Sequence, residues 1–284
     1  MGTSTRNSGQ SGHNPLVPTW LDYSASFNSG HQVILPQQPS VQLQQPIQLP
    51  IQPIPPNADA NRFRGPRTSF SHFISSGGHN SSTMRNGVSS YVGRSLGGSS
   101  NATKRLGSSR ASTARLYGFL HSLSGPDGFQ EVARLLSLDT LVGLPASEFF
   151  IRLAEFVCPD GGSEDEGISR SAYYDVVADN PDIMDKAIED LTEDEIDSIS
   201  QRYMTKVVMQ QIMNGIANNL IRFSETLEQI SYIEDAVEEL IGQSVSDACA
   251  ALKQNYVEMT NERAKEITDG IYLKVFEILE GLGD

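Results

Sequence analysis

Residues 192–230 have the sequence TEDEIDSISQRYMTKVVMQQIMNGIANNLIRFSETLEQI, and this stretch decides the fold class. Thr192 is followed three residues later by Glu195, a capping-box spacing that predicts the start of a long helix. Apolar residues then recur at alternating spacings of four and three, as on the buried face of a helix. They are Met209, Met213, Ile216, Leu220, Phe223, Leu227 and Ile230. We expect this stripe to form the core of an intramolecular helical bundle, and a seam between two copies in a homodimer is the alternative.

Similar helix signals continue through residues 116–284. Asn180 and Pro181 fit an N-cap followed by proline at the first helical position. Further helices are predicted over Phe129–Leu138, Ser147–Val157, Ile168–Ala178 and Asp182–Leu191. The last helix carries a second apolar stripe, formed by Ile267, Ile271, Val275, Ile278 and Leu282. Because the chain shows no convincing strand alternation, the predicted fold class is all-α, with a multi-helix, bundle-like C-terminal body preceded by a long disordered N-terminal tail.

Charge is divided unequally along the 284 residues. Residues 1–115 contain ten Lys or Arg and two acids, Asp22 and Asp59, whereas residues 116–284 contain 33 acids and eleven Lys or Arg. Residues 36–56 form a Pro/Gln-rich tract in which proline recurs too often for a regular helix. The predicted organisation is a disordered tail over residues 1–66, a basic, Ser/Gly-rich and partly helical segment over 67–115, and an acidic all-helical domain over 116–284.

Composition excludes several classes of protein. Unbroken apolar stretches span only a few residues, so no membrane-spanning segment is expected. The polar start, Met1 to Arg6, lacks the apolar region of a secretory signal. Two cysteines, Cys158 and Cys249, make no disulfide framework, and we expect both to be reduced and buried. The expected location is therefore the cytoplasm.

Motifs for catalysis or metal binding are weak in this chain. Residues 93–97 match the G-x-S-x-G pattern of a nucleophile elbow, but no strand precedes them as that motif requires. Residues 158–168 hold acids and glycines that are out of register with a calcium-binding loop. The histidines are scattered, and the sequence has no phosphate-binding loop. We therefore predict no catalytic residue, no metal site and no cofactor, and a protein that is not an enzyme.

The N-terminal arm carries two features that stand out from the polar sequence around them. Removal of Met1 would leave the amine of Gly2 at an open end, and Arg6 argues against N-myristoylation. Further along, an apolar island surrounds the single tryptophan and comprises Leu16, Val17, Trp20 and Leu21. An isolated apolar cluster gains free energy by docking into a pocket, either on a partner or on the chain's own body.

Six segments of the chain carry a family resemblance. They are Met1–Thr5, Pro15–Asp22, Ser89–Val92 with Leu96–Gly98, Arg105–Gly107, Val157–Gly162 and Asp165–Arg170. Taken in this order, they resemble the QatB family, whose members are components of the Qat anti-phage defence systems of bacteria. The Pro/Gln-rich tract lies outside the resemblance.

The resemblance implies partners and a modification that composition and spacing do not indicate. QatB proteins are encoded with QatA, a P-loop ATPase, with QatC, an enzyme of the QueC family, and with QatD, a TatD-like nuclease. By resemblance, a QatC-like enzyme attaches a 7-deazaguanine group to the N-terminal glycine of its partner protein. In this chain the modified atom would be the amine of Gly2, and the enzyme pocket would read Thr3 and Ser4.

Two functional hypotheses follow from these observations. In the first, the chain is a non-enzymatic defence component whose arm docks on the QatC-like enzyme through Leu16, Val17, Trp20 and Leu21 and is modified on Gly2. QatA-like ATPases and QatD-like nucleases are further candidate partners in this hypothesis. In the second, the basic segment over residues 62–115 binds nucleic-acid phosphates or serves as a scaffold, although the acidic body would repel nucleic acid.

Overall fold

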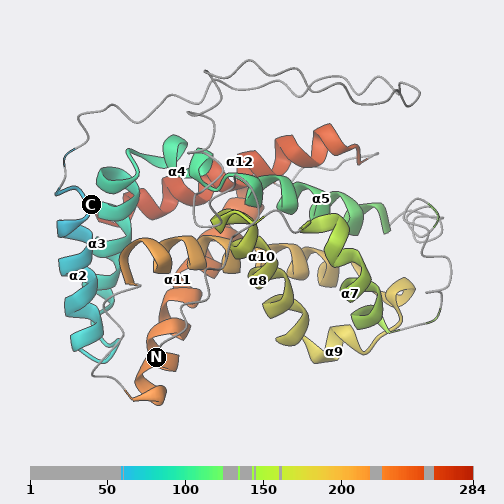
Figure 1. Cartoon of the computed structure of the whole chain (residues 1–284), viewed down its shortest axis with the longest axis horizontal. Helices are drawn as coiled ribbons and strands as arrows, with labels where there is room; N and C mark the ends of the chain where they lie inside the picture. The colour runs from blue at the N-terminus through green and yellow to red at the C-terminus, as the bar shows by residue number, and fades with distance from the viewer. Residues whose placement is uncertain are drawn as a thin grey trace, which may run out of the picture.

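The computed structural model describes Asp59 and residues 61–123, 134, 143, 145–159, 162–217, 226–252 and 259–283. Within these residues the regular structure is helical, apart from one isolated β-bridge between Pro145 and Ala187 (Figure 1). The first α-helices are α2 (Arg64–Ser75), α3 (Ser81–Ser90), α4 (Ser99–Arg105), α5 (Ser108–Leu123) and α7 (Ala146–Val157). They are followed by α8 (Glu164–Ala178), α9 (Pro181–Met184), α10 (Glu193–Ile212), α11 (Leu227–Leu252) and α12 (Asn261–Gly281). Between them lie two π-helices, η1 (Tyr91–Ser95) and η4 (Met213–Ala217), and the 3₁₀-helix η3 (Ile188–Asp190). The predicted all-α class is confirmed.

Helix α10 lies in the middle of the bundle, where it packs against α5, α8 and α11 (Figure 1). Helix α12 contacts α3, α4, α5 and α11. Large side chains from both halves of the chain fill the same core, among them Phe70, Phe149, Tyr173, Tyr203 and Phe276. Residues 64–123 contain no Asp or Glu, so we call α2–α5 the acid-free helices. One apolar core therefore joins the acid-free helices to the acidic helices that follow.

The capping box predicted for α10 is confirmed. Thr192 Oγ1 accepts a hydrogen bond from the Glu195 N–H at 3.3 Å, and the Glu195 carboxylate accepts one from the Thr192 N–H at 3.0 Å. Lys186 donates to the same carboxylate, and this bond together with those from Thr192 lowers the pKa of Glu195. Ser163 and Glu166 form an equivalent box at the start of α8. Acids in the first turn of both helices favour these starts, because they face the positive end of the helix dipole.

The long apolar stripe of residues 209–230 is not one helical seam. Helix α10 ends at Ile212, the chain continues through η4, and α11 begins at Leu227, whose side chain is 85% exposed. Along the stripe, Met209, Met213 and Ile216 lie in or against the core, whereas Leu220 and Phe223 lie outside the described residues. The prediction of a continuous buried stripe is wrong at Leu227. Thr226 is not helical, so Leu227 begins a separate helix, and a spacing rule that assumes one continuous helix does not hold there.

The second stripe behaves as predicted. Ile271 and Val275 of α12 are buried in the core, and Ile267, Ile278 and Leu282 pack against it. These contacts confirm an intramolecular bundle core for this stripe.

Two other predicted helices are confirmed. The predicted helix Ser147–Val157 is α7, and the predicted helix Ile168–Ala178 is contained in α8, which begins four residues earlier.

The predicted helix Asp182–Leu191 is wrong. The segment instead forms the single turn α9 and the separate η3. Between them, the carbonyl oxygen of Lys186 accepts a hydrogen bond from the Ala146 N–H at 2.7 Å, next to the β-bridge at Ala187. This pairing ties the segment to the start of α7 in an extended conformation, so a continuous helix is interrupted.

Several predicted segments cannot be compared with the structure. Most of the tail over residues 1–66 and the predicted helix Phe129–Leu138, except Arg134, lie outside the described residues. The basic segment over residues 67–115 is described throughout, and most of it is helical. Among the helices that the structure describes, none is both long enough and apolar enough to cross a membrane.

The two π-helices meet where the acid-free helices contact the acidic ones. Tyr91 of η1 is buried, and its hydroxyl donates to the carbonyl oxygen of Gln211 over 3.3 Å. The Tyr91 ring also packs against Gly215 of η4, so closely that a methyl group on Gly215 would overlap the ring and its hydroxyl. Glycine is required at position 215 because of this close approach.

Substituting Gly215→Ala should lower the free energy of unfolding by about 1–3 kcal/mol, the usual cost of overpacking a buried site. Gly242→Ala in α11 is the matched control, because a methyl group there would meet only ordinary contacts, with Thr205 at 3.7 Å. The control should raise the free energy of unfolding by up to about 1 kcal/mol through better helix propensity. Urea unfolding followed by circular dichroism measures both values, and equal effects at the two glycines would contradict the close contact at Tyr91.

Candidate functional site

The sequence-predicted site residues on the arm are not placed by the structure. Gly2, Thr3 and Ser4, and the island residues Leu16, Val17, Trp20 and Leu21, lie outside the described residues. Their roles therefore stay predictions. The described chain starts at Asp59, and a turn through Asn61 leads directly into α2. The arm therefore joins the body at the N-terminal end of α2.

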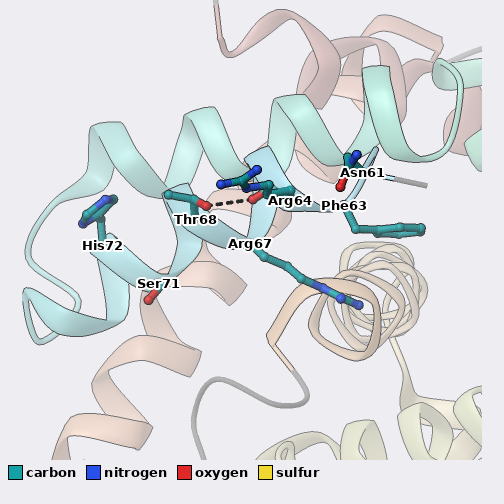
Figure 2. Close-up of a pocket in the computed structure, with 7 residues that line it drawn as sticks. All are labelled: Asn61, Phe63, Arg64, Arg67, Thr68, Ser71 and His72. Carbon is teal, nitrogen blue, oxygen red and sulfur yellow. Dashed lines mark hydrogen bonds between the residues drawn. The ribbon is translucent and has the colours of Figure 1, made fainter. Parts of the chain in front are cut away.

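Two hollows lie beside this end of α2. The first, the α2 hollow, has a volume of about 540 Å³ and runs along the polar side of the helix (Figure 2). Its lining residues are Asn61, Phe63, Arg64, Arg67, Thr68, Ser71 and His72. Thr68 Oγ1 donates to the carbonyl oxygen of Arg64 at 2.8 Å, the dashed line in Figure 2. The α2 hollow therefore contains two arginines, and its residues come from α2 and the turn before it.

The second hollow is the helix-junction cleft, where residues of α2, η1, α4, α8, α10 and η4 meet in a volume of about 270 Å³. It is lined by Phe63, Arg67, Tyr91, Leu96, Arg105, Glu164, Asp165, Ile168, Gln211, Asn214 and Gly215. Phe63 and Arg67 line both hollows, so the cleft and the α2 hollow adjoin at these two side chains. The lining combines aromatic rings, guanidinium groups, carboxylates and amides.

Two arginines stack on Phe63, one of the residues that line the cleft. The guanidinium carbon of Arg62 lies 5.1 Å from the centre of the Phe63 ring, and that of Arg67 lies 5.3 Å from it. Arg67 also donates to the carbonyl oxygen of Gly215 at 3.3 Å. In Figure 2 its side chain extends from α2 toward the neighbouring helical segment. This arrangement presents guanidinium groups beside a ring, which suits both stacking and pairing with a carboxylate.

Tyr91, a buried residue of the cleft lining, is uncharged. Burial is the main cause that raises the pKa of Tyr91 to about 12, so the phenol keeps its proton at neutral pH. Nearby, burial lowers the pKa of Arg105, and the positive charge of Arg62 lowers it further. The positive charges of Arg62 and Arg105 therefore repel one another.

The two carboxylates that line the cleft, those of Glu164 and Asp165, have different roles. Asp165 is almost fully buried, and its carboxylate accepts hydrogen bonds from the Ser108 N–H at 2.5 Å and the Ser108 hydroxyl at 2.9 Å. It thereby caps the start of α5, which explains an acid at this buried position. Glu164 is exposed in the first turn of α8. Of the two acids, Glu164 is the one open to solvent.

The G-x-S-x-G match does not form a nucleophile elbow. Its serine, Ser95, ends the π-helix η1 and is buried, and its hydroxyl donates to the carbonyl oxygen of Arg62 at 2.8 Å. A nucleophile elbow needs a sharp turn between a strand and a helix. The serine instead fixes the turn that places Arg62 and Phe63 beside the cleft.

Cys158 has a structural role. Cys158 is buried, with its sulfur 3.4 Å from the Tyr203 hydroxyl. Burial raises the pKa of its thiol, which disfavours the reactive thiolate. The predicted burial is confirmed for Cys158, whereas Cys249 is only partly buried. Among the described residues, no group of three His, Cys, Asp or Glu side chains could hold a metal ion.

The basic segment divides into structural and exposed residues. Arg110 makes a two-bond ion pair with Asp269 of α12, with Nε of Arg110 at 2.7 Å from the carboxylate. Arg115 donates to the carbonyl oxygen of Val157 at the end of α7. By contrast, the side chains of Arg64, Arg85 and Arg94 are exposed. Two cations of the proposed nucleic-acid segment therefore hold the bundle together, and others face solvent.

A comparison with protein families matches this helical body. The family model described as "Qat anti-phage system associated protein QatB" matches residues 97–279, well over half of the chain. The chain belongs to the QatB family. This membership makes it a component associated with an anti-phage defence system. Searches of curated proteins and of solved structures gave no match.

The QatB match covers only part of the helix-junction cleft. Arg105, Asn214 and Gly215 lie within the matched residues, whereas Phe63 and Arg67 precede them. Sequence reasoning missed this cleft, because its residues come from six elements that are distant in sequence. One usable signal was present, since an isolated glycine inside an apolar helical stripe, here Gly215, often marks a close approach by another group.

The division of the basic residues can be tested by stability measurements. Arg110→Gln should lower the free energy of unfolding by about 1–2 kcal/mol, because two charge-assisted bonds to Asp269 are lost. The exposed Arg85→Gln should change it by less than about 0.5 kcal/mol. Both variants remove one positive charge, so a similar loss in both would contradict a specific structural role for Arg110. Urea unfolding at one fixed ionic strength makes the comparison.

Proposed function

We propose that this chain is a non-enzymatic component of its Qat system that presents its N-terminal glycine to a partner enzyme. The partner is a QatC-like enzyme of the QueC family, which attaches a 7-deazaguanine group to the amine of Gly2. Thr3 and Ser4 contact the enzyme pocket, and the island of Leu16, Val17, Trp20 and Leu21 anchors the arm. QatA-like and QatD-like proteins are further partners of the same system.

The observation that carries this proposal is membership of the QatB family together with the length of the arm. Gly2 precedes the first turn of α2, at Arg64, by 62 positions. A chain of that length spans at most roughly 200 Å when fully extended. The terminal amine can therefore enter a deep enzyme pocket while the helical body stays outside it.

The chemistry of the terminus also supports a role as substrate. An α-amino group has an ordinary pKa of about 7.7–8.0, so a useful fraction is neutral and nucleophilic near pH 7. The most reactive side chains of the body are unsuited to attack, since Ser95 donates to a carbonyl oxygen and burial raises the pKa of Cys158. In this proposal the catalytic groups belong to the partner, and this chain supplies the amine.

Mass spectrometry of the N-terminal peptide tests the modification. After co-expression with the neighbouring Qat proteins, we expect the peptide that begins at Gly2 to carry the added mass on its amine. Gly2→Pro, or a two-residue extension ahead of Gly2, should abolish the modification, because each changes the attacking amine or its position. The helical content measured by circular dichroism should stay the same.

Gly9→Pro is the matched control, since it places the same residue in the arm and leaves the terminal amine unchanged. This variant should still be modified. An unmodified wild-type terminus in the presence of an active QatC-like enzyme would overturn the proposal. Loss of modification in both proline variants would instead indicate that the enzyme reads the arm as far as residue 9.

Nucleic-acid binding by residues 62–115 is a second candidate function, favoured by the exposure of Arg64, Arg85 and Arg94 on helices that have no acid. Arginines of this kind contact phosphates, and the resulting affinity falls steeply with salt. The acidic helices weaken such binding by repulsion. This function therefore ranks below presentation of Gly2.

Filter binding over a series of salt concentrations tests the second candidate. Binding through the segment would give retention of DNA or RNA at about 50 mM salt, and each lost phosphate contact would reduce the salt slope by about one. Arg64→Gln with Arg85→Gln should then bind more weakly, while Lys265→Gln on exposed α12 surface should not. Absence of retention at about 50 mM salt would remove this candidate.

A further inference from the structure

We propose that the helix-junction cleft binds residues 15–22 of this chain's own N-terminal arm, with Trp20 beside Phe63 and Arg67. The arm would then be held against the body that carries it. This docking needs no partner protein, and it competes with the proposed use of the same island as an anchor on the partner enzyme. It assigns an occupant to a cleft that the defence function does not explain.

The chemistry of the cleft matches that of the island. Arg62 and Arg67 already stack on Phe63, and tryptophan is the best ring for a contact with a guanidinium group. Leu96 and Ile168 also line the cleft, and both are almost fully buried. Gln211 and Asn214 carry amides that can pair with the backbone of an extended peptide.

Charge adds a reason for this occupant. Residues 61–123 contain no Asp or Glu, and Asp22, next to the apolar island, is one of only two acids before residue 116. Arg67 lines the cleft and is exposed, so its guanidinium group is accessible to a carboxylate. The carboxylate of Asp22 would pair with this group. Pro15 and Pro18 favour an extended backbone, which suits a segment that lies along a cleft.

The position of the arm makes docking within one chain favourable. The arm joins the body at Asn61, and Phe63, two residues later, already lines the cleft. The 36 residues from 23 to 58 separate Asp22 from the described chain, and they span at most roughly 120 Å at full extension, which is long enough to return to the cleft. A tether of this kind gives an effective concentration in the millimolar range, so even a weak contact would be occupied.

Docking at Trp20 would leave the end of the arm free. Gly2 precedes Trp20 by 18 positions, which allows a reach of roughly 60 Å at full extension. The body would thus hold the middle of the arm and shorten the range over which the terminal amine moves. A partner that needs the island would have to displace it from the cleft.

Trp20 is the only tryptophan, so its fluorescence reports on the island alone in the full-length chain. In the docked state, its emission should lie at shorter wavelength than in a synthetic peptide of residues 12–26. The acrylamide quenching constant should be several-fold lower than in that peptide. Both values should be independent of protein concentration, as docking within one chain requires.

Two cleft variants and one matched control locate the contact. Arg67→Glu and Asn214→Glu, both at exposed positions of the cleft lining, should raise the quenching constant to that of the free peptide. Arg85→Glu makes the same charge reversal on α3 outside the cleft and should leave it unchanged. Thermal unfolding followed by circular dichroism shows whether each variant is folded. If Arg67→Glu does not fold, Asn214→Glu alone tests the contact.

Three outcomes would overturn the proposal. Equal quenching in the full-length chain and in the free peptide would show that the island is not docked. Shielding that both cleft variants leave unchanged would place the island elsewhere. Shielding that appears only as the protein concentration rises would assign the cleft to the arm of a second copy.

Discussion

Close contact between the Tyr91 ring and the backbone of Gly215 determines how the acid-free helices meet the acidic ones. Both residues lie in π-helices, and the Tyr91 hydroxyl also donates to the carbonyl oxygen of Gln211. This contact brings η1 and η4 together and forms the floor of the helix-junction cleft. Arg67 spans the same junction from α2 to Gly215. The cleft lies where two π-helices, rather than two α-helices, pack together.

Local signals in the sequence predicted most of the fold, and contacts between distant segments account for the errors. The capping box at Thr192 and the stripe through Ile271 depend on neighbours within a few turns, so they could be identified directly. The helix expected over residues 182–191 is interrupted by pairing with the start of α7, which no local pattern records. The π-helix η4 likewise arises where Gly215 meets Tyr91, more than 120 positions away in the chain. The cleft was missed for the same reason.

The structure separates the part of the chain that carries the family match from the part that carries the predicted modification. Residues 97–279 match the QatB family and form most of the bundle, whereas Gly2 and Trp20 lie on the arm. Polar contacts within the bundle, such as those of Asp165 with Ser108 and of Arg110 with Asp269, connect its helices. The chemistry proposed for the system therefore concerns the arm, which joins the body at the start of α2.

Because residues 61–123 contain no acid and the following helices are rich in Asp and Glu, positive charge is concentrated on the acid-free helices. The α2–α3 pair, drawn in blue to green in Figure 1, carries the exposed Arg64, Arg67 and Arg85. In the field of a strongly charged surface, such a molecule rotates before it makes contact, so that a polyanion meets this pair first. At physiological ionic strength the field fades within about 8 Å, which restricts this orientation to the last step of an encounter.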